Sequence, residues 1–287
     1  MITKEFAITI ILMISVNSGC QKGENMIELG EPRRKIKTGL PTDGLFIVVG
    51  DPKSGKTKFG ASMLGSIVLE CEPGGGDRVD GWIKDVTSLA EFREAIKAAV
   101  AEPKIKTIVV DTVDTLSDWL EDEVAKSKGL EKITDRRPGV DGFELWGTYR
   151  GKIECLVAYL KATGKLVVLL AHCREAKADD NGNIVTPKGI NVPGKSGAFL
   201  AAQADIIGYT FKRPVGGVTQ YVMTFQGGPS GNWGSRLSEV NDKTITLPEA
   251  DPYSAFVALF EGAAPASNGN KTEKITTTKS AVSAGRR

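Results

Sequence analysis

Eight consecutive residues have the types and the spacing that bind the phosphates of a nucleotide. They fit the pattern G-x-x-x-x-G-K-[ST], in which glycines let backbone N–H groups turn inward around the phosphates. Lys56 is expected to reach the β- and γ-phosphate oxygens, and the Thr57 hydroxyl to hold Mg²⁺. An ordinary Gly-rich turn is the alternative. The sequence therefore predicts a P-loop that binds ATP and Mg²⁺, formed by Gly50, Asp51, Pro52, Lys53, Ser54, Gly55, Lys56 and Thr57.

A second acidic element follows about fifty residues later. The segment "TIVVDT" is an apolar run that ends in Asp111. An acid at the end of a buried strand can hold Mg²⁺ through water in nucleotide hydrolases. Many buried strands also end in an aspartate that only caps the next helix. The distance from the P-loop favours the magnesium role for Asp111.

Two glutamates near the end of another apolar run are candidates for the general base. In "VLECEP", Glu70 and Glu72 are two residues apart and share one face of a strand. Only Glu72 lies beyond the expected end of that strand, where a carboxylate can orient water toward a γ-phosphate. Glu72 is therefore the predicted base, with Glu70 as the competitor and a solvated turn acid as the plain alternative.

The single histidine of the chain, His172, ends a fourth apolar run, "KLVVLLAH". A polar residue there can sense the γ-phosphate and pass its state to the loop that follows. The alternative is a buried histidine with satisfied hydrogen bonds. A metal site at His172 is not expected, because the chain has no second histidine.

The elements that position these residues form an α/β pattern. Continuous apolar runs predict buried strands at 45–50, 66–71, 107–111 and 165–172. Helices are expected between them, at 56–64, 88–101, 116–128 and 143–163. Such alternation predicts a mainly parallel sheet with helices on both faces. Two later runs, 206–212 and 219–226, flank "RPVGGV" and predict an antiparallel hairpin at one edge. Short helices are expected at 199–203 and 253–260.

The length and composition of the chain indicate one domain with a well-packed hydrophobic core, together with flanking segments. The 287 residues carry a net charge of only +2, so strong attraction of the whole chain to nucleic acid is not indicated. Residues 1–25 contain an apolar run and Cys20, which resemble a lipoprotein signal peptide but conflict with an ATP-using domain. We expect this leader to be dispensable and the functional protein to begin at Met26. The predicted organisation is a leader (1–25), an ATPase domain (26–262) and a disordered basic tail (263–287).

The cysteines and the leader bear on where the protein works. The four cysteines show neither a CxxC pair nor metal-ligand spacing, and buried reduced thiols are expected. Together with the P-loop, this predicts a cytoplasmic protein without membrane contact, unless the leader is real.

The loop from Arg174 to Lys195 is a candidate surface for single-stranded DNA. It carries Arg174, Lys177, Lys188 and Lys195 but no aromatic residue. Lysines and arginines can contact backbone phosphates, whereas the lack of rings limits base stacking. A plain surface loop is the alternative interpretation.

The order strand, P-loop, helix, "VLECEP", "TIVVDT" and "VVLLAH" resembles that of the RecA-like ATPases. More narrowly, "GVDGFELWGTYRGKIECLVAYL" followed by "VVLLAHCRE" resembles small phage-encoded AAA-type nucleotide-binding proteins, some of which are single-strand annealing recombinases. The resemblance covers residues 38–260. It implies a RecA-like P-loop fold, ATP hydrolysis with a base that matches Glu72, and coupling to DNA through the position of His172, where a glutamine is common.

The resemblance also implies oligomers, as a ring or a filament, with ATP between subunits. A basic residue would then reach in from the neighbour, and four candidates are left unranked: Lys188, Lys195, Arg213 and Arg236. The predicted function is ATP-dependent phage DNA recombination, annealing or replication. A packaging or helicase-like motor and a non-enzymatic nucleotide-gated scaffold are the alternatives.

Overall fold

A computed structural model describes residues 38–228 and 231–261 of the chain. The expectations about the leader, the start at Met26, Cys20 and the basic tail lie outside the described residues. The described part divides no further, because all of it belongs to one compact unit.

The centre of the fold is a mixed sheet whose strands are mostly parallel. Its main path runs in the order β12-β10-β9-β1-β5-β4-β2-β3. The parallel part contains β1 (Gly44–Gly50), β2 (Ser66–Glu70), β3 (Trp82–Asp85), β4 (Thr107–Asp111), β5 (Leu166–Arg174) and β9 (Ile206–Val215). Beyond β9, the strands β10 (Val218–Thr224) and β12 (Thr244–Leu247) pair antiparallel. This is an α/β P-loop NTPase fold, as the alternation of apolar runs predicted.

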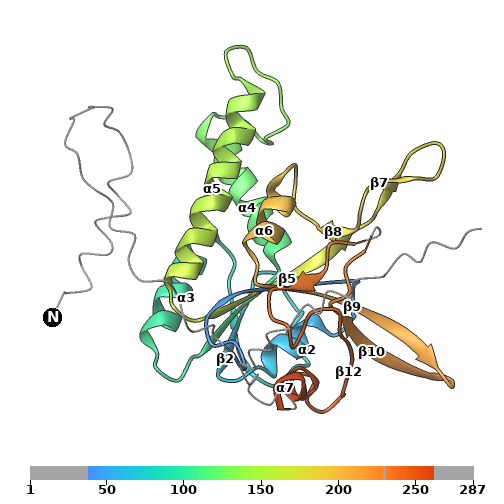
Figure 1. Cartoon of the computed structure of the whole chain (residues 1–287). Helices are drawn as coiled ribbons and strands as arrows, with labels where there is room; N and C mark the ends of the chain where they lie inside the picture. The colour runs from blue at the N-terminus through green and yellow to red at the C-terminus, as the bar shows by residue number, and fades with distance from the viewer. Residues whose placement is uncertain (1–37, 229–230, 262–287) are drawn as a thin grey trace, which may run out of the picture. The chain divides into compact units, whose positions relative to one another are not determined.

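Helices cover both faces of the sheet, as parallel strands require. They are α2 (Lys56–Ala61), α3 (Leu89–Ala101), α4 (Val113–Ser127), α5 (Gly142–Ala162), α6 (Ser196–Gln203) and α7 (Ser254–Glu261). Figure 1 shows α4, α5 and α6 above the sheet and α2 and α7 below it. No helix that the structure describes is both long enough and apolar enough to cross a membrane.

Side chains of β1 alternate between two apolar cores. Leu45, Ile47 and Val49 pack with buried residues of α3, α4, α5 and α6. Phe46 and Val48 pack on the other face with residues of α2 and α7. All five side chains are buried. Burial on both faces explains why β1 is continuously apolar, and it fixes the strand end from which the P-loop starts.

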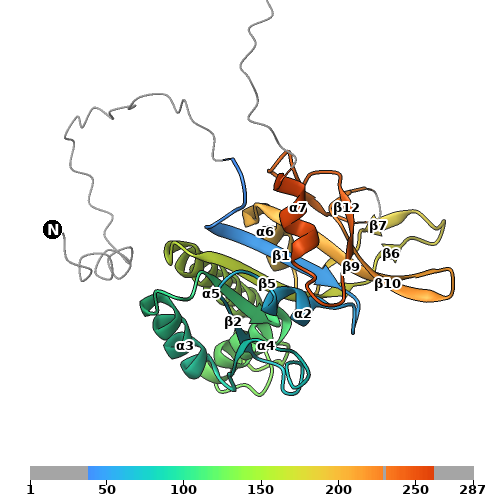
Figure 2. The ribbon, with the colours of Figure 1, turned by 90° about the horizontal axis from the view of Figure 1, so that it is seen from below.

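Two hairpins project from the same side of the molecule in both ribbon views (Figures 1 and 2). One joins β6 (Lys177–Ala178) to β7 (Ile184–Thr186) across a turn that contains Asn181 and Gly182. The other joins β9 to β10 across Gly216 and Gly217, which have φ of 57° and 81°. The sequence predicted the second of these hairpins. It did not predict β3, β8 (Gly189–Ile190), β11 (Gly234–Ser235) or β12, which are at most four residues long.

The cysteines differ from expectation in one respect. Cys71, Cys155 and Cys173 are free thiols, but only Cys71 is buried and Cys155 is exposed. The expectation of buried thiols was therefore wrong for Cys155, because its place on α5 faces away from the core that Ile153 and Val157 enter.

Candidate nucleotide-binding site

The predicted site residues meet at one edge of the sheet, where the parallel strands end. In register, Gly50 at the end of β1 lies beside His172 of β5. At the ends of β2 and β4, Glu70 lies beside Asp111. Since the carboxyl ends of parallel strands share an edge, residues far apart in the sequence surround the start of α2.

Backbone conformation shapes the P-loop itself. Gly55 and Lys53 have φ of 92° and 60°, in the left-handed region that glycine adopts most readily. A Cβ at Gly50 would overlap the hydroxyl of Thr210 on β9, so only glycine fits there. The Ser54 hydroxyl lies 2.7 Å from the Thr210 hydroxyl, and both side chains are buried. The loop is thus held against β9.

Lys56 lies at the centre of the site with its ammonium inside the loop. Nζ donates to the carbonyl oxygens of Gly50 at 3.1 Å and Asp51 at 2.9 Å. The side chain is 6% exposed, and this burial lowers the pKa of Lys56, although Asp111 and Asp114 act in the opposite direction. A buried cation held only by carbonyl groups and nearby carboxylates suits an incoming phosphate.

Thr57 and Asp111 form the contact on which the magnesium prediction depends. The Thr57 hydroxyl donates a hydrogen bond of 2.6 Å to Oδ2 of Asp111. Asp111 is 5% exposed, and burial raises its pKa despite this hydrogen bond and the charge of Lys56. A hydroxyl and one carboxylate side by side are a donor set that Mg²⁺ uses together with phosphate oxygens and waters.

No larger ligand cluster competes with that pair. Within residues 38–228 and 231–261, no group of three or more His, Cys, Asp or Glu side chains is placed to hold a metal ion. Thr57 and Asp111 would be the residues that hold Mg²⁺ carried in with a nucleotide, and the ion would neutralise charge on the phosphates.

The two candidate bases have different environments. Glu70 is 4% exposed, and its Oε1 accepts the backbone N–H of Gly76 at 2.7 Å. Glu72 follows the end of β2, is exposed, and lines the same cavity as Lys56. Glu70 is thus engaged in holding the loop after β2, while Glu72 is open to a water. The choice of Glu72 as the base stays a prediction.

His172 lines the cavity and is tied to α4. Its backbone N–H donates to Oδ2 of Asp114 at 2.9 Å, and its Nδ1 lies 3.7 Å from the same oxygen. Burial raises the pKa of Asp114, and the N–H of His172 opposes that shift. The sequence did not single out Asp114, although an acid in the first turn of a helix after a strand was a usable signal.

The cavity extends beyond the phosphate-binding residues. It encloses about 950 Å³ and is lined by the P-loop, Glu72, Asp111 and His172. Other lining residues come from β10, from the last residue of β12 and from the segment that follows it, namely Tyr221, Leu247, Pro248, Glu249 and Pro252. Sequence reasoning missed this part of the lining, which has the apolar and aromatic character that suits a nucleoside.

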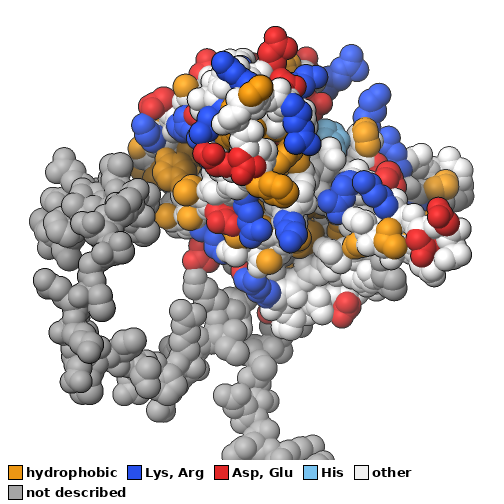
Figure 3. Space-filling model, turned by 90° about the horizontal axis from the view of Figure 1, so that it is seen from above, with side chains coloured by type: hydrophobic (Ala, Val, Ile, Leu, Met, Phe, Trp, Pro, Cys, Tyr) orange, Lys and Arg blue, Asp and Glu red, His pale blue; other side chains and the backbone are white. Residues whose placement is uncertain are grey.

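The basic residues predicted to reach a neighbouring subunit or DNA are not gathered in this cavity. Lys195 and Arg213 are exposed, whereas Lys188 is paired with Glu175 at 3.1 Å. Arg236 pairs with Asp205 at 3.0 Å, next to the start of β1 and therefore at the opposite end of that strand from the P-loop. Figure 3 shows Lys and Arg side chains on both sides of the pale-blue histidine, His172.

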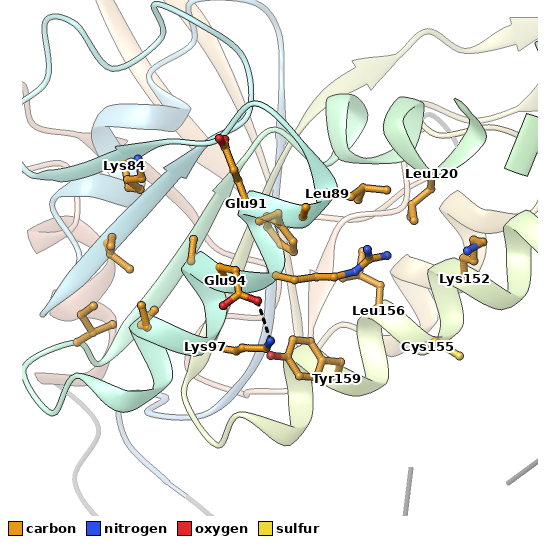
Figure 4. Close-up of a pocket in the computed structure, with 18 of the residues that line it drawn as sticks. Lys84, Leu89, Glu91, Glu94, Lys97, Leu120, Lys152, Cys155, Leu156 and Tyr159 are labelled. Atoms are coloured by element: carbon orange, nitrogen blue, oxygen red, sulfur yellow. Dashed lines mark hydrogen bonds and ion pairs between the residues drawn. The ribbon is translucent and has the colours of Figure 1, made fainter. Parts of the chain in front are cut away.

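A larger groove lies between α3 and α5 and contains none of the predicted site residues. It measures about 1500 Å³. In Figure 4, Leu89, Leu156 and Tyr159 face its interior, and Glu94 bonds Lys97 at its rim. Its lining lacks the P-loop and the strand ends, so it is separate from the nucleotide site.

The comparisons with known proteins agree with this geometry. A family model described as "AAA domain" matches residues 45–237. The chain is also 29% identical over 150 residues to the SPbeta prophage-derived uncharacterized protein YorG of Bacillus subtilis (strain 168). That match covers 50% of this chain and 44% of YorG, so the chain spans less than half of that relative's length. With a P-loop, an acidic strand end and an α/β sheet in one matched region, the chain belongs to the AAA domain family of P-loop proteins.

Proposed function

We propose that this chain binds ATP with Mg²⁺, hydrolyses it, and acts on single-stranded DNA in phage recombination, annealing or replication. The observation that carries the proposal is the 2.6 Å hydrogen bond between Thr57 and Asp111 at the mouth of the P-loop. It places a magnesium-type donor pair beside the buried ammonium of Lys56 and in the same cavity as Glu72. The AAA family assignment supports nucleotide use in general.

The proposed hydrolysis uses the chain's own groups in distinct roles. Lys56 neutralises charge on the β- and γ-phosphates, and Thr57 with Asp111 would hold the metal ion, which supplies further charge neutralisation. Glu72 accepts a proton from water while the water oxygen bonds to the γ-phosphorus and the bond to the ADP oxygen breaks. His172 lies where it can report the γ-phosphate to the segment that follows β5.

The DNA part of the proposal depends on the segment after His172. Lys177 and Lys195 are exposed there, and the β6–β7 hairpin projects on the same side of the molecule as the β9–β10 hairpin, which carries Lys212 and Arg213 (Figures 1 and 2). Cationic side chains on projecting hairpins suit the phosphate backbone of a single strand. The prophage name of the relative supports a phage context.

The proposal includes assembly and location. Glu72 and most of the loop after β2 are exposed, which leaves room for a second subunit to close the site in a ring or filament. A neighbouring subunit would supply one basic residue to the site, and Lys195 and Arg213 are the favoured candidates. In the described part of the chain, neither forms an ion pair with an acidic side chain. We place the protein in the host cytoplasm, where ATP is present.

The experiment that tests the proposal is ATP turnover of the full chain with and without single-stranded DNA. Double-stranded DNA of the same length is the control. We expect hydrolysis that depends on Mg²⁺ and rises with the single strand. Negligible turnover under all conditions would support a nucleotide-gated scaffold instead, and strong stimulation by the duplex would support a motor.

A further inference from the structure

Tyr209 of β9 joins the P-loop to a cluster of aromatic and basic side chains. It lies beside Val49 in the register of β9 and β1, one residue before the pair Gly50 and Thr210. Its hydroxyl donates a hydrogen bond of 3.0 Å to Oδ1 of Asp51, the second residue of the P-loop. The hydroxyl is therefore tied to the segment that binds phosphate.

The ring of Tyr209 contacts two other segments. It stacks on Trp233, with centroids 4.6 Å apart and an interplanar angle of 7°. The ammonium of Lys188, in the segment between β7 and β8, lies 5.9 Å from its centroid. Lys188 also forms a backbone bridge with Gly231, where a Cβ would overlap the Trp233 ring. The segments that carry Lys188 and Trp233 are thus packed together on the Tyr209 ring.

Phosphate binding changes the charges around Asp51. In the structure, Lys56 Nζ donates to the backbone carbonyls of Asp51 and Gly50. An ammonium has three donors, so the third can reach a phosphate while these two bonds stay. A bound triphosphate therefore brings negative charge next to the carboxylate of Asp51, whose Oδ1 holds Tyr209. A ligand shifts a conformational equilibrium only through such a difference between states.

We propose that Tyr209 is a positioning residue that transmits nucleotide binding from Asp51 to the surface around Lys188 and Trp233, where single-stranded DNA is bound. The DNA part rests on the proposed function, whereas the link from Asp51 to Trp233 does not. In this arrangement the phosphate charge repels the carboxylate of Asp51, and Tyr209 moves with Asp51. Lys188, which is otherwise held by Glu175 and the Tyr209 ring, then becomes available to a DNA phosphate.

The test uses the full chain with ATPγS, a slowly hydrolysed ATP analogue, and two readouts. The first is tryptophan fluorescence, with Trp233→Phe measured in parallel to identify the part that comes from Trp233. The second is affinity for a single-stranded oligonucleotide with and without ATPγS. Tyr209→Phe removes only the hydroxyl and keeps the stacked ring. Tyr159→Phe, in the separate groove between α3 and α5, is the matched control.

We expect saturating ATPγS to change the Trp233 emission of wild type and of Tyr159→Phe, and Tyr209→Phe to lose most of that change. The gain in DNA affinity, about 5-fold or more for coupling of ordinary size, should fall toward 1-fold in Tyr209→Phe. Asp51→Ala breaks the same hydrogen bond from the P-loop side and should lose the same response. It also provides the test if Tyr209→Phe unfolds.

Two results would overturn the link: no Trp233 response in wild type at saturating nucleotide, or a full response in Tyr209→Phe and Asp51→Ala. A normal Trp233 response and its loss in Tyr209→Phe, in a wild-type chain that binds no DNA, would instead refute the proposed DNA function and support the link. The two failures are therefore distinguishable.

Discussion

The hydroxyl of Thr57 lies 2.6 Å from Oδ2 of Asp111, so the first residues of α2 are joined to the end of β4. These residues are separated by 54 positions in the sequence. Strand β5 lies between β1 and β4 in the sheet, so the chain leaves β1 and passes β5 before the start of α2 meets the end of β4. It brings the phosphate-binding loop and the acidic strand end into one site.

Removing that hydroxyl should weaken the magnesium-dependent part of nucleotide binding. Thr57→Val keeps the shape of the side chain and removes the hydroxyl that donates to Asp111. A buried acceptor without its donor costs about 1–3 kcal/mol in the free energy of folding. Calorimetric titration of ATP with Mg²⁺ and with EDTA measures the effect. Thr57→Ser restores the hydroxyl and should bind as wild type does. Equal affinity gains from Mg²⁺ in wild type and Thr57→Val would contradict the assignment.

Glu72→Gln should bind ATP normally and hydrolyse it slowly. Loss of a general base typically lowers the rate by about 10²–10⁴-fold, whereas binding depends on the P-loop. Single-turnover phosphate release measures the rate. Glu70→Gln is the matched comparison, since Glu70 bonds the N–H of Gly76 instead of facing the cavity. If Glu70→Gln loses turnover and Glu72→Gln keeps it, the base is Glu70.

Asp111→Asn should make the nucleotide-free chain more stable at neutral pH. Burial raises the pKa of Asp111 above its ordinary value of 3.8. Because the pKa of Asp111 is higher in the folded state, its protonated carboxyl adds to the free energy of unfolding below pH 3.8. That contribution is lost as the pH rises through the folded-state pKa. Each pKa unit corresponds to about 1.4 kcal/mol. The advantage of Asn should therefore shrink as the pH falls toward 3.8.

Urea unfolding of wild type and Asp111→Asn across that pH range measures the difference, with the exposed Asp80→Asn as a surface control. With Mg²⁺ and ATP present, the order of stability should reverse, because only the wild-type carboxylate assists the ion. A wild type that is more stable than Asp111→Asn without nucleotide at neutral pH would refute the argument from burial.

The affinity for single-stranded DNA should fall steeply with salt, and Lys188 and Lys195 should account for part of the slope. Each phosphate neutralised on a single strand contributes about −0.7 to the slope of log affinity against log salt. Replacing both lysines with alanine should reduce the slope accordingly and remove most of the gain from ATP. The control is the double variant Lys97→Ala and Lys126→Ala. These two lysines lie on α3 and α4 and not in the segment after β5.

These DNA measurements are repeated on a chain without residues 263–287, since the predicted basic tail can bind DNA without nucleotide. Its removal should lower the background and keep the ATP effect. An affinity that ATP leaves unchanged in that chain would favour the scaffold alternative.

The sequence was sufficient for the parts of the site that depend on local pattern. The P-loop is a contiguous motif, and buried parallel strands are continuously apolar, so Lys56, Thr57 and Asp111 could be assigned from residue types and spacing alone. His172 was predicted from the same rule to end the fourth strand, but β5 continues two residues further, to Arg174. Their meeting at one sheet edge is a consequence of parallel strands, and the structure confirms it.

The parts that the sequence left open depend on register and on short elements. Tyr209 and Thr210 contact the P-loop only because β9 pairs with β1 in one particular register. Tyr221 enters the cavity from β10, and the facing segment follows β12, a strand of four residues. Such contacts join segments more than 150 residues apart, so no local pattern indicates them.

The most direct test of the account is ATP turnover by Lys56→Ala. Lys56 is the buried cation of the loop. Each hydrogen bond from its ammonium to a phosphate oxygen would contribute about 1.5–3 kcal/mol to nucleotide binding. Lys53→Ala removes an exposed lysine of the same loop and is the matched control. The account predicts Mg²⁺-dependent turnover in wild type and Lys53→Ala, and loss of nucleotide binding and turnover in a folded Lys56→Ala chain. Equal nucleotide affinity and turnover in wild type and Lys56→Ala would contradict it.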